Sequence, residues 1–256
     1  MLSIRSHLFT ALFYLLTAVL AILGLPYLAF NRLAVQSLAR IWVSASLWLL
    51  EKICRIKVEF RGLENLPAGA CLIAAKHQST LETLALPLAA HDFSFVLKRE
   101  LVAIPIFGWY LQRAEQVAID RAKRGQALSD LNRQVRQALA QGRQIIIFPE
   151  GTRRPVDAPL QYKAGVAHLY VEAGAVCVPV ALNTGLFWPR GNGLRRPGTA
   201  VIAFLEPIGT GLDKQSFMTA LETRIEAATA KLVAEALAAD PSLKGAAGQP
   251  RNVAAL

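Results

Sequence analysis

The sequence predicts an α/β fold in which a mixed, largely parallel central sheet is flanked by helices and preceded by an N-terminal membrane helical hairpin. Three observations predict it. The chain begins with long apolar runs, short β-type runs follow from residue 56, and helical patterns alternate with those runs. We therefore expect N-terminal membrane-anchoring helices over residues 1–55, one α/β domain over 56–240, and a disordered Pro-, Gly- and Ala-containing tail over 241–256.

The N-terminal hairpin is predicted from residues 8–30, which contain no charged residue. This run exceeds the roughly 20 apolar residues that cross a bilayer core, and it is too long for the apolar stretch of about 7–15 residues in a secretory signal. A second apolar run at 33–50 carries one charge, Arg40, and two tryptophans, Trp42 and Trp48, that suit a membrane interface. It either spans the membrane or lies in its interface. The alternative is a buried hairpin within a soluble core.

Composition agrees with a membrane protein that has anionic partners. Hydrophobic residues make up 54% of the chain, mean hydropathy is +0.35, and the net charge is +10. Such a charge suits phosphate headgroups or coenzyme A. Nucleic acid is not expected as a partner, because zinc-finger spacing, an aromatic-rich RNA signature and basic repeats are missing from the sequence. The three cysteines lack metal-ligand spacing, so we expect no metal site and a reducing compartment.

The α/β domain is predicted from alternating short strands and helices. Val-, Ile- and Phe-rich runs bounded by Gly, Pro or charged residues predict strands at 57–61, 71–75, 93–97, 116–119, 145–148, 176–182 and 200–205. Helices are expected at 80–89, 125–141, 165–173 and 217–237.

A first candidate site follows the apolar strand 71–75, where α/β folds place ligands. His77 there can act as a general base near neutral pH, and Glu82 can hold its imidazole in the correct tautomer. An i,i+5 pair on one helix diverges by roughly 140°, so His77 must precede the helix and Glu82 must lie in its first turn. Glu82 also fits a capping box with Ser79, and the two roles are compatible.

A second candidate site is the hexamer 148–153, a loop after the buried strand 145–148. Gly151 permits close backbone approach, Thr152 offers a hydroxyl, and Arg153 offers a planar fork for a phosphate. The alternative is a surface turn with a solvated arginine.

Two further segments have weaker signals on their own. Lys98 and Arg99 are cations beside an otherwise apolar loop that continues to Gly108, and the alternative is a solvated helix start with a snorkelling lysine. Val178, Pro179 and Val180 lie in an apolar strand whose plainer explanation is the core.

Taken together and in this order, the four segments resemble the conserved blocks of the glycerolipid acyltransferase family, in particular the bacterial 1-acylglycerol-3-phosphate acyltransferases. That resemblance covers roughly residues 56–206, and the apolar N-terminus is similar too. The sequence departs from the family pattern twice. Glu82 replaces the usual Asp, which keeps the carboxylate, and the strand after Pro179 lacks a second proline.

The resemblance implies a metal-free and cofactor-free reaction without a covalent acyl-enzyme. His77 would take the proton of the acceptor hydroxyl as it attacks the thioester of acyl-CoA or acyl carrier protein, and Glu82 would stabilise the imidazolium. Backbone amides near Gly151 are candidates for stabilising the tetrahedral intermediate. Residues expected to bind substrate are Lys98, Arg121, Glu150, Gly151, Thr152 and Arg153.

The resemblance further implies phosphatidic acid synthesis from lysophosphatidic acid on the cytoplasmic face of a bacterial inner membrane, with membrane lipid as a partner. Alternative acceptors are another lysophospholipid, a lyso-ornithine lipid or glycerol 3-phosphate. A serine hydrolase using Ser79 is disfavoured because no G-x-S-x-G elbow is present. A non-catalytic protein that binds anionic lipid would explain the charge and the apolar N-terminus, but not the ordered blocks.

Overall fold

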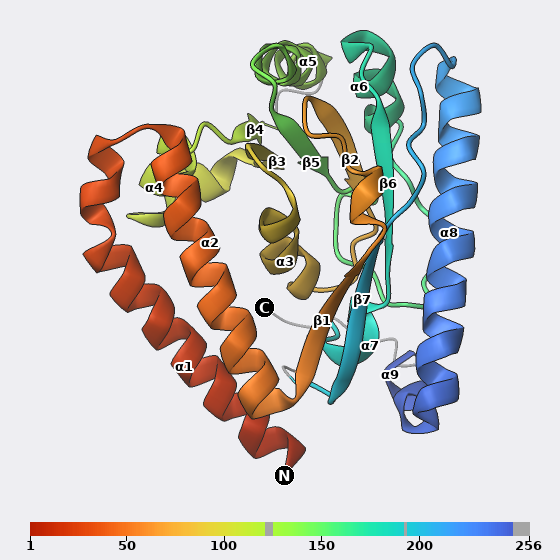
Figure 1. The fold of residues 1–256 in the computed structure, drawn as a ribbon. Helices are drawn as coiled ribbons and strands as arrows, with labels where there is room; N and C mark the ends of the chain where they lie inside the picture. The colour runs from red at the N-terminus through yellow and green to blue at the C-terminus, as the bar shows by residue number, and fades with distance from the viewer. Residues whose placement is uncertain (121–124, 192–193, 248–256) are drawn as a thin grey trace.

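The computed structural model describes residues 1–120, 125–191 and 194–247. A seven-stranded sheet has the order β1-β7-β6-β2-β5-β3-β4 (Figure 1). All neighbouring pairs are parallel except β6 and β7, so the predicted mixed, largely parallel sheet is confirmed. The strands are β1 Ile56–Arg61, β2 Cys71–Ala75, β3 Phe93–Lys98, β4 Val117–Ile119, β5 Gln144–Ile147, β6 Cys177–Leu182 and β7 Gly198–Phe204.

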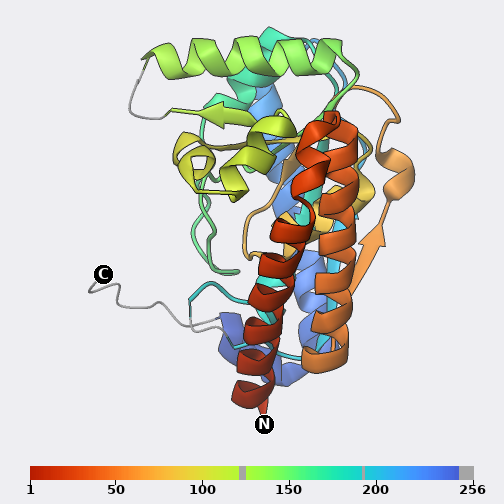
Figure 2. The same ribbon diagram turned by 90° about the vertical axis from the view of Figure 1, so that its left-hand side faces the viewer.

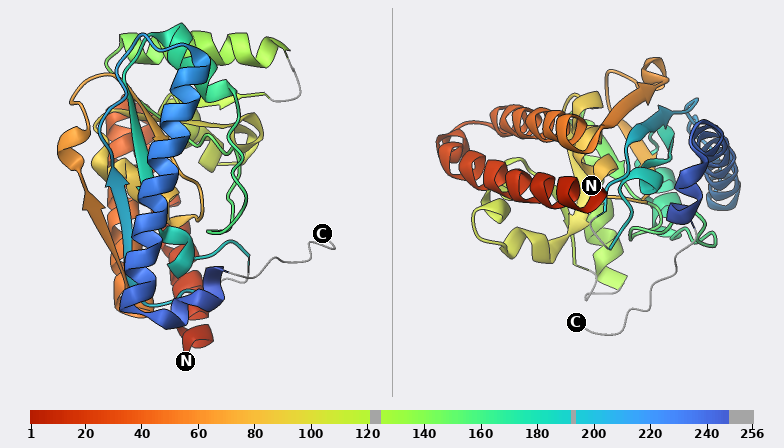
Figure 3. Two further views of the ribbon diagram at one scale, coloured as in Figure 1. Left: turned by 90° about the vertical axis from the view of Figure 1, so that its right-hand side faces the viewer. Right: turned by 90° about the horizontal axis from the view of Figure 1, so that it is seen from below.

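Helices cover both faces of the sheet, as the view from below shows (Figure 3). Leu72 and Ala74 of β2 belong to a core with α5, α6 and α8, whereas Ile73, between them, packs with α3. This alternation follows from the two-residue repeat of a strand. The helices of the domain are α3 Leu81–Ala89, α4 Phe107–Arg113, α5 Gly125–Ala140, α6 Gly165–Ala173, α7 Thr184–Phe187, α8 Lys214–Ala239 and α9 Lys244–Ala247.

The N-terminal hairpin consists of α1 (Leu2–Leu23) and α2 (Arg32–Leu49), which lie side by side along one flank of the domain (Figure 2). Both are long and apolar enough to cross a membrane. Only 11% of the apolar window of α1 and 28% of that of the second helix are buried. A hairpin buried in a soluble core would be covered, so that alternative does not hold.

Polar contacts attach α2 to the domain. The Arg40 guanidinium donates to the carbonyls of Pro87 and Ala90, at 3.2 and 2.8 Å, at the end of α3. Gln36 donates to the Asp92 carboxylate at 2.8 Å. Carbonyls at a helix end lack partners within the helix, so the only charge of the second apolar run has a structural use. These contacts hold α2 along the domain.

The C-terminal part differs from the prediction of a disordered tail over 241–256. A 3-10 helix (Pro241–Leu243) and α9 follow α8, and Leu243 is buried. Leu243 packs with Phe187 and Leu186 in a core cluster that composition alone did not indicate. Residues 248–256 lie outside the described residues.

Candidate active site

The predicted blocks meet because their strands are neighbours in the sheet. β6, β2, β5 and β3 lie side by side in that order and run parallel, so the loops after them share one edge. The loop after β2 carries His77, the loop after β5 carries Arg153, and β3 ends at Lys98. Segments distant in the sequence thus form one site.

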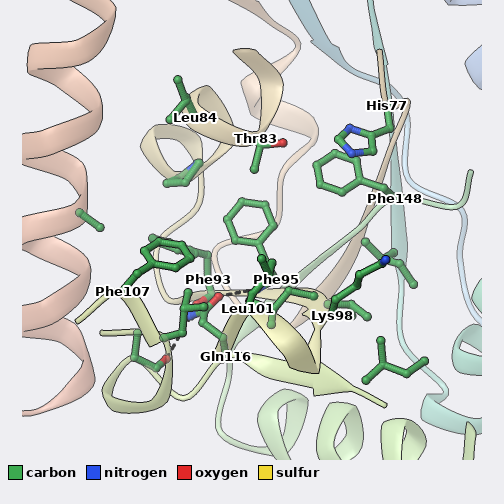
Figure 4. A pocket seen from close by; sticks show the side chains of 18 of the residues that line it. His77, Thr83, Leu84, Phe93, Phe95, Lys98, Leu101, Phe107, Gln116 and Phe148 are labelled. Carbon is green, nitrogen blue, oxygen red and sulfur yellow. Dashed lines mark hydrogen bonds between the residues drawn. The ribbon is translucent and has the colours of Figure 1, made fainter. Parts of the chain in front are cut away.

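His77 lies in the turn before α3, and Glu82 lies in the first turn, as the spacing predicted. His77 Nδ1 and Glu82 Oε1 are 2.9 Å apart. An ionised carboxylate only accepts, so Nδ1 carries the donated proton and Nε2 is left to take one from a substrate. The imidazole also stacks on Phe148, with ring centroids 4.0 Å apart (Figure 4). Both contacts fix the orientation of the ring.

The Glu82 carboxylate is fully buried and serves both roles that the sequence left open. Its Oε1 accepts from the backbone N–H groups of Gln78 and Ser79, at 2.8 and 2.7 Å, which caps the start of α3. The same oxygen binds His77. Its Oε2 accepts from the Thr184 hydroxyl at 2.7 Å. A buried charge is tolerated only when it is well hydrogen-bonded, and this one is held by donors on both oxygens.

Thr184 is a residue of the site that was not predicted from the sequence. It is fully buried at the start of α7, directly after β6. The apolar strand around Pro179 therefore brings a hydroxyl to Glu82. Nothing in the local sequence indicates this, because the contact joins residues 102 positions apart.

Glu150, expected among the substrate-binding residues, instead supports the loop of His77. It is 2% exposed, accepts from the His77 backbone N–H at 2.8 Å, and pairs with buried Lys76 at 3.2 Å. Lys76 also binds Glu226 of α8 at 2.6 Å. Burial raises the pKa of Glu150, and the Lys76 charge opposes that rise. The hexamer 148–153 does lie at the site, but the side chain of Glu150 points into the protein and away from the cavity.

The other residues of the hexamer line a cavity of about 890 Å³. Gly151 adopts a φ of +69°, and its N–H donates to the Phe148 carbonyl at 2.9 Å. This amide is therefore committed to the turn and is not available to a tetrahedral intermediate. Thr152 and Arg153 border the cavity, and Arg153 Nη1 donates to the Thr80 hydroxyl at 2.6 Å.

Three cations, Lys98, Lys163 and Arg153, line the same cavity as His77. Lys98 borders the cavity from the end of β3 (Figure 4), and Lys163 borders it from the segment before α6. Lys163 is not among the substrate-binding residues expected from the sequence. Arg121 lies outside the described residues. The polar end thus joins a positioned histidine with Arg153, Lys98 and Lys163.

The opposite end of the cavity is apolar. Its lining comes from the hairpin, from β3 and from α4, and it includes Leu20, Leu38, Val43, Phe93, Phe107 and Leu111. An extended apolar cavity beside a few positioned polar groups suits a ligand with a charged head and a hydrocarbon chain.

Ser79 is not placed as a nucleophile. Its hydroxyl donates to the Trp188 carbonyl at 2.6 Å and accepts from the Leu81 N–H at 3.1 Å, and the residue is fully buried. Among the described residues, no cluster of three or more His, Cys, Asp or Glu could hold a metal ion.

A histidine–carboxylate pair beside a cationic, then apolar, cavity defines a site for activating a hydroxyl on an amphipathic substrate. Comparison with known proteins agrees with this description of the site. The model of the Acyltransferase family matches residues 57–183. The 1-acyl-sn-glycerol-3-phosphate acyltransferase of Pseudomonas aeruginosa is 36% identical over 236 residues, which cover 88% of this chain and 90% of that protein. The chain belongs to the acyltransferase family.

Two further similarities are more distant. A 1-acyl-sn-glycerol-3-phosphate acyltransferase of Chlamydomonas reinhardtii is 34% identical over 188 residues, and the alignment covers 72% of this chain but 55% of that longer protein. The crystal structure of the 1-acyl-sn-glycerophosphate (LPA) acyltransferase of Thermotoga maritima superposes with a TM-score of 0.76. It shares 24% identity and covers 91% of this chain and 98% of its own, and this likeness supports the fold.

Proposed function

We propose that this chain transfers a fatty acyl group from acyl-CoA or acyl carrier protein to the free hydroxyl of 1-acylglycerol 3-phosphate, which gives phosphatidic acid. The observation that carries the proposal is the position of the His77–Glu82 pair, 2.9 Å apart, at the cationic end of an apolar cavity. A lysophosphatidic acid would place its phosphate near Arg153, Lys98 and Lys163 and its acyl chain among apolar side chains.

In the proposed reaction, His77 Nε2 takes the proton of the acceptor hydroxyl as the oxygen attacks the thioester carbonyl. Glu82 stabilises the imidazolium that forms. Collapse of the tetrahedral intermediate breaks the C–S bond, and the imidazolium returns the proton to the leaving thiolate. The ester and the free thiol are the products. The reaction as proposed uses no metal or other cofactor, so activity should survive dialysis against a chelator.

We further propose that the enzyme acts at the cytoplasmic face of a bacterial inner membrane. The two apolar helices support membrane association. Because α2 is attached along the domain through Arg40 and Gln36, the domain is held close to any bilayer that the hairpin enters.

A panel of acceptors tests the proposal. Purified protein in mixed micelles would receive a labelled acyl thioester with lysophosphatidic acid, lysophosphatidylcholine, lyso-ornithine lipid or glycerol 3-phosphate. We expect lysophosphatidic acid to give the highest kcat/KM. Transfer to another acceptor with equal or greater efficiency would overturn the choice of acceptor, and no transfer to any acceptor would overturn the enzymatic role.

A further inference from the structure

Residues 101–109, which follow β3 and run into α4, expose large apolar side chains outside the hairpin. Leu101, Ile104, Phe107 and Trp109 are 37%, 44%, 44% and 52% exposed. They lie within nine residues of one another: Leu101 is on the short 3-10 helix Arg99–Ala103, Ile104 follows that helix, and Phe107 and Trp109 are on the first turn of α4. Scattered apolar residues are normal on a surface, but a cluster of this kind indicates an interaction site.

The backbone of this segment holds that arrangement firmly. Ile106 adopts a φ of +65°, which a β-branched residue rarely does. A Cβ on Gly108 would lie 2.0 Å from the Val102 carbonyl oxygen, so only glycine allows this close approach. A strained residue persists where the surrounding structure fixes it. The exposed side chains are therefore presented on a defined turn.

The cluster continues the apolar surface of the hairpin. The Tyr110 hydroxyl of α4 donates to the Ala21 carbonyl of α1 at 2.8 Å. The next residues of α1, Ile22 and Leu23, are 59% and 70% exposed. Figure 2 shows the yellow-green segment beside the upper part of α1. Residues 101–109 and the end of α1 thus form one apolar surface.

The charges beside this apolar surface, and its position at the cavity, indicate which partner it binds. Three exposed cations flank the segment, Lys98, Arg99 and Arg113. They outnumber the one carboxylate between residues 98 and 113, the exposed Glu100, so the net charge suits the anionic headgroups of a phospholipid bilayer. Leu101 and Phe107 are exposed and also line the cavity, so the same surface borders the route into the site (Figure 4).

We propose that residues 101–109 form a second membrane-contacting element, which inserts into the interfacial layer of an anionic bilayer beside α1 and opens the cavity toward the lipid phase. The inference rests on the proposed function, because a membrane-borne lysolipid is the substrate that would use this route. Trp109 suits the interface, where an aromatic ring with an N–H group is favoured. The acceptor would then enter laterally between Leu101 and Phe107 without crossing water.

Fluorescence from a single introduced cysteine tests the position of the segment. The native Cys54, Cys71 and Cys177 are buried, and burial raises the pKa of the Cys71 thiol to about 12, so an introduced cysteine can be labelled selectively. The full chain carrying Ile104→Cys would receive a nitrobenzoxadiazole label. Leu63→Cys is the matched control, because Leu63 and Ile104 have the same exposed fraction, 44%.

Vesicles of phosphatidylcholine and phosphatidylglycerol should shift the emission at position 104 to the blue, and spin labels on the acyl chains should quench it, with neither effect at position 63. Equal emission at both positions would overturn the proposal. So would a blue shift that appears without vesicles when protein concentration rises, because that result would assign the surface to a second copy of the chain.

Kinetics distinguish this proposal from the proposed function. Trp109→Asp should lower the rate with vesicle-borne acceptor about tenfold, since a charge opposes interfacial binding, and Trp109→Phe should restore it. A soluble short-chain acceptor should react within about twofold of wild type. An equal loss with both acceptors would overturn the membrane role. If wild-type protein transfers no acyl group at all, the proposed function fails while the fluorescence still decides the position of the segment.

Discussion

The two ends of the cavity are built differently. At the polar end, His77 and Arg153 are held by hydrogen bonds of 2.6–2.9 Å to named partners. At the apolar end, α1, α2 and α4 contribute side chains such as Leu38 and Leu111, which act through surface area. The first end depends on the direction of individual atoms, and the second depends on the volume and apolar area that it offers.

The two ends should therefore differ in the substitutions that they tolerate. The proposed chemistry at the polar end needs one charge and one proton in fixed places. Removing either group should therefore lower kcat strongly and change the dependence of the rate on pH. Truncating a side chain at the apolar end should weaken substrate affinity in proportion to the apolar area removed, and it should leave the dependence of the rate on pH unaltered.

The polar end is broken most severely by removing the charge of Glu82. Glu82→Gln retains an oxygen that can cap the backbone of residues 78 and 79 but loses the charge that stabilises the imidazolium. We expect kcat to fall roughly 10²- to 10⁴-fold with little change in Tm. Glu82→Asp keeps the charge and should retain far more activity. Equal losses in the two variants would leave Glu82 with the capping role alone.

A smaller loss is expected from Arg153→Lys. The planar fork of arginine binds two phosphate oxygens, whereas an ammonium offers a point charge. We expect kcat/KM to fall roughly 10- to 100-fold when lysophosphatidic acid is varied, as for a lost charge-assisted hydrogen bond, with the KM of the acyl donor unchanged.

Thr80→Val is the matched control, because it removes the 2.6 Å contact with Arg153 and keeps the guanidinium. If Thr80→Val reproduces the loss in kcat/KM seen in Arg153→Lys, Arg153 only holds the loop in place. The same conclusion follows if Arg153→Lys also changes the KM of the acyl donor and the melting temperature.

Thr184 acts through Glu82 and should give a loss of about tenfold in kcat as Thr184→Val, which removes one hydrogen bond to a charged group. Thr184→Ser keeps the hydroxyl and should restore the rate. The valine variant should lower kcat and leave the KM of both substrates within about twofold, because Thr184 contacts Glu82 and does not line the cavity. An unchanged kcat with a lower Tm would instead indicate a purely structural contact.

The smallest effect is expected at the apolar end. Leu38 is 9% exposed and lines the cavity, so Leu38→Ala should lower stability by about 2 kcal/mol, the lower end for Leu→Ala, because the space already borders a cavity. We expect the KM for long-chain acceptors to rise only a few-fold. A changed pH profile in Leu38→Ala would show that the two ends are not independent.

Much of the fold was accessible from sequence. Apolar β-type runs gave all of the observed strands within about two residues, and the match at β2 (Cys71–Ala75) is complete, because buried parallel strands have continuous apolar runs. Helix α4 was missed. It is short, it follows Pro105, and it begins after the unusual φ of Ile106, which is set by tertiary packing.

The site was predictable where chemistry follows from local spacing, as for His77 and Glu82. It was not predictable where tertiary structure decides. The side chain of Glu150 turns inward to Lys76, and Thr184 reaches Glu82 only because β6 and β2 are neighbours in the sheet. A motif fixes the position of a residue along the chain, whereas the direction of its side chain depends on packing.

The role of His77 as the general base is tested by single-turnover acyl transfer with the His77→Ala variant, with the affinity for lysophosphatidic acid measured separately. We expect a rate at least about 100-fold below wild type, an affinity within a few-fold of wild type, and a normal melting curve. The His91→Ala variant, which changes an exposed histidine, should match wild type in all three. Retention of more than about a tenth of the wild-type rate by His77→Ala would contradict the assignment of His77 as the general base.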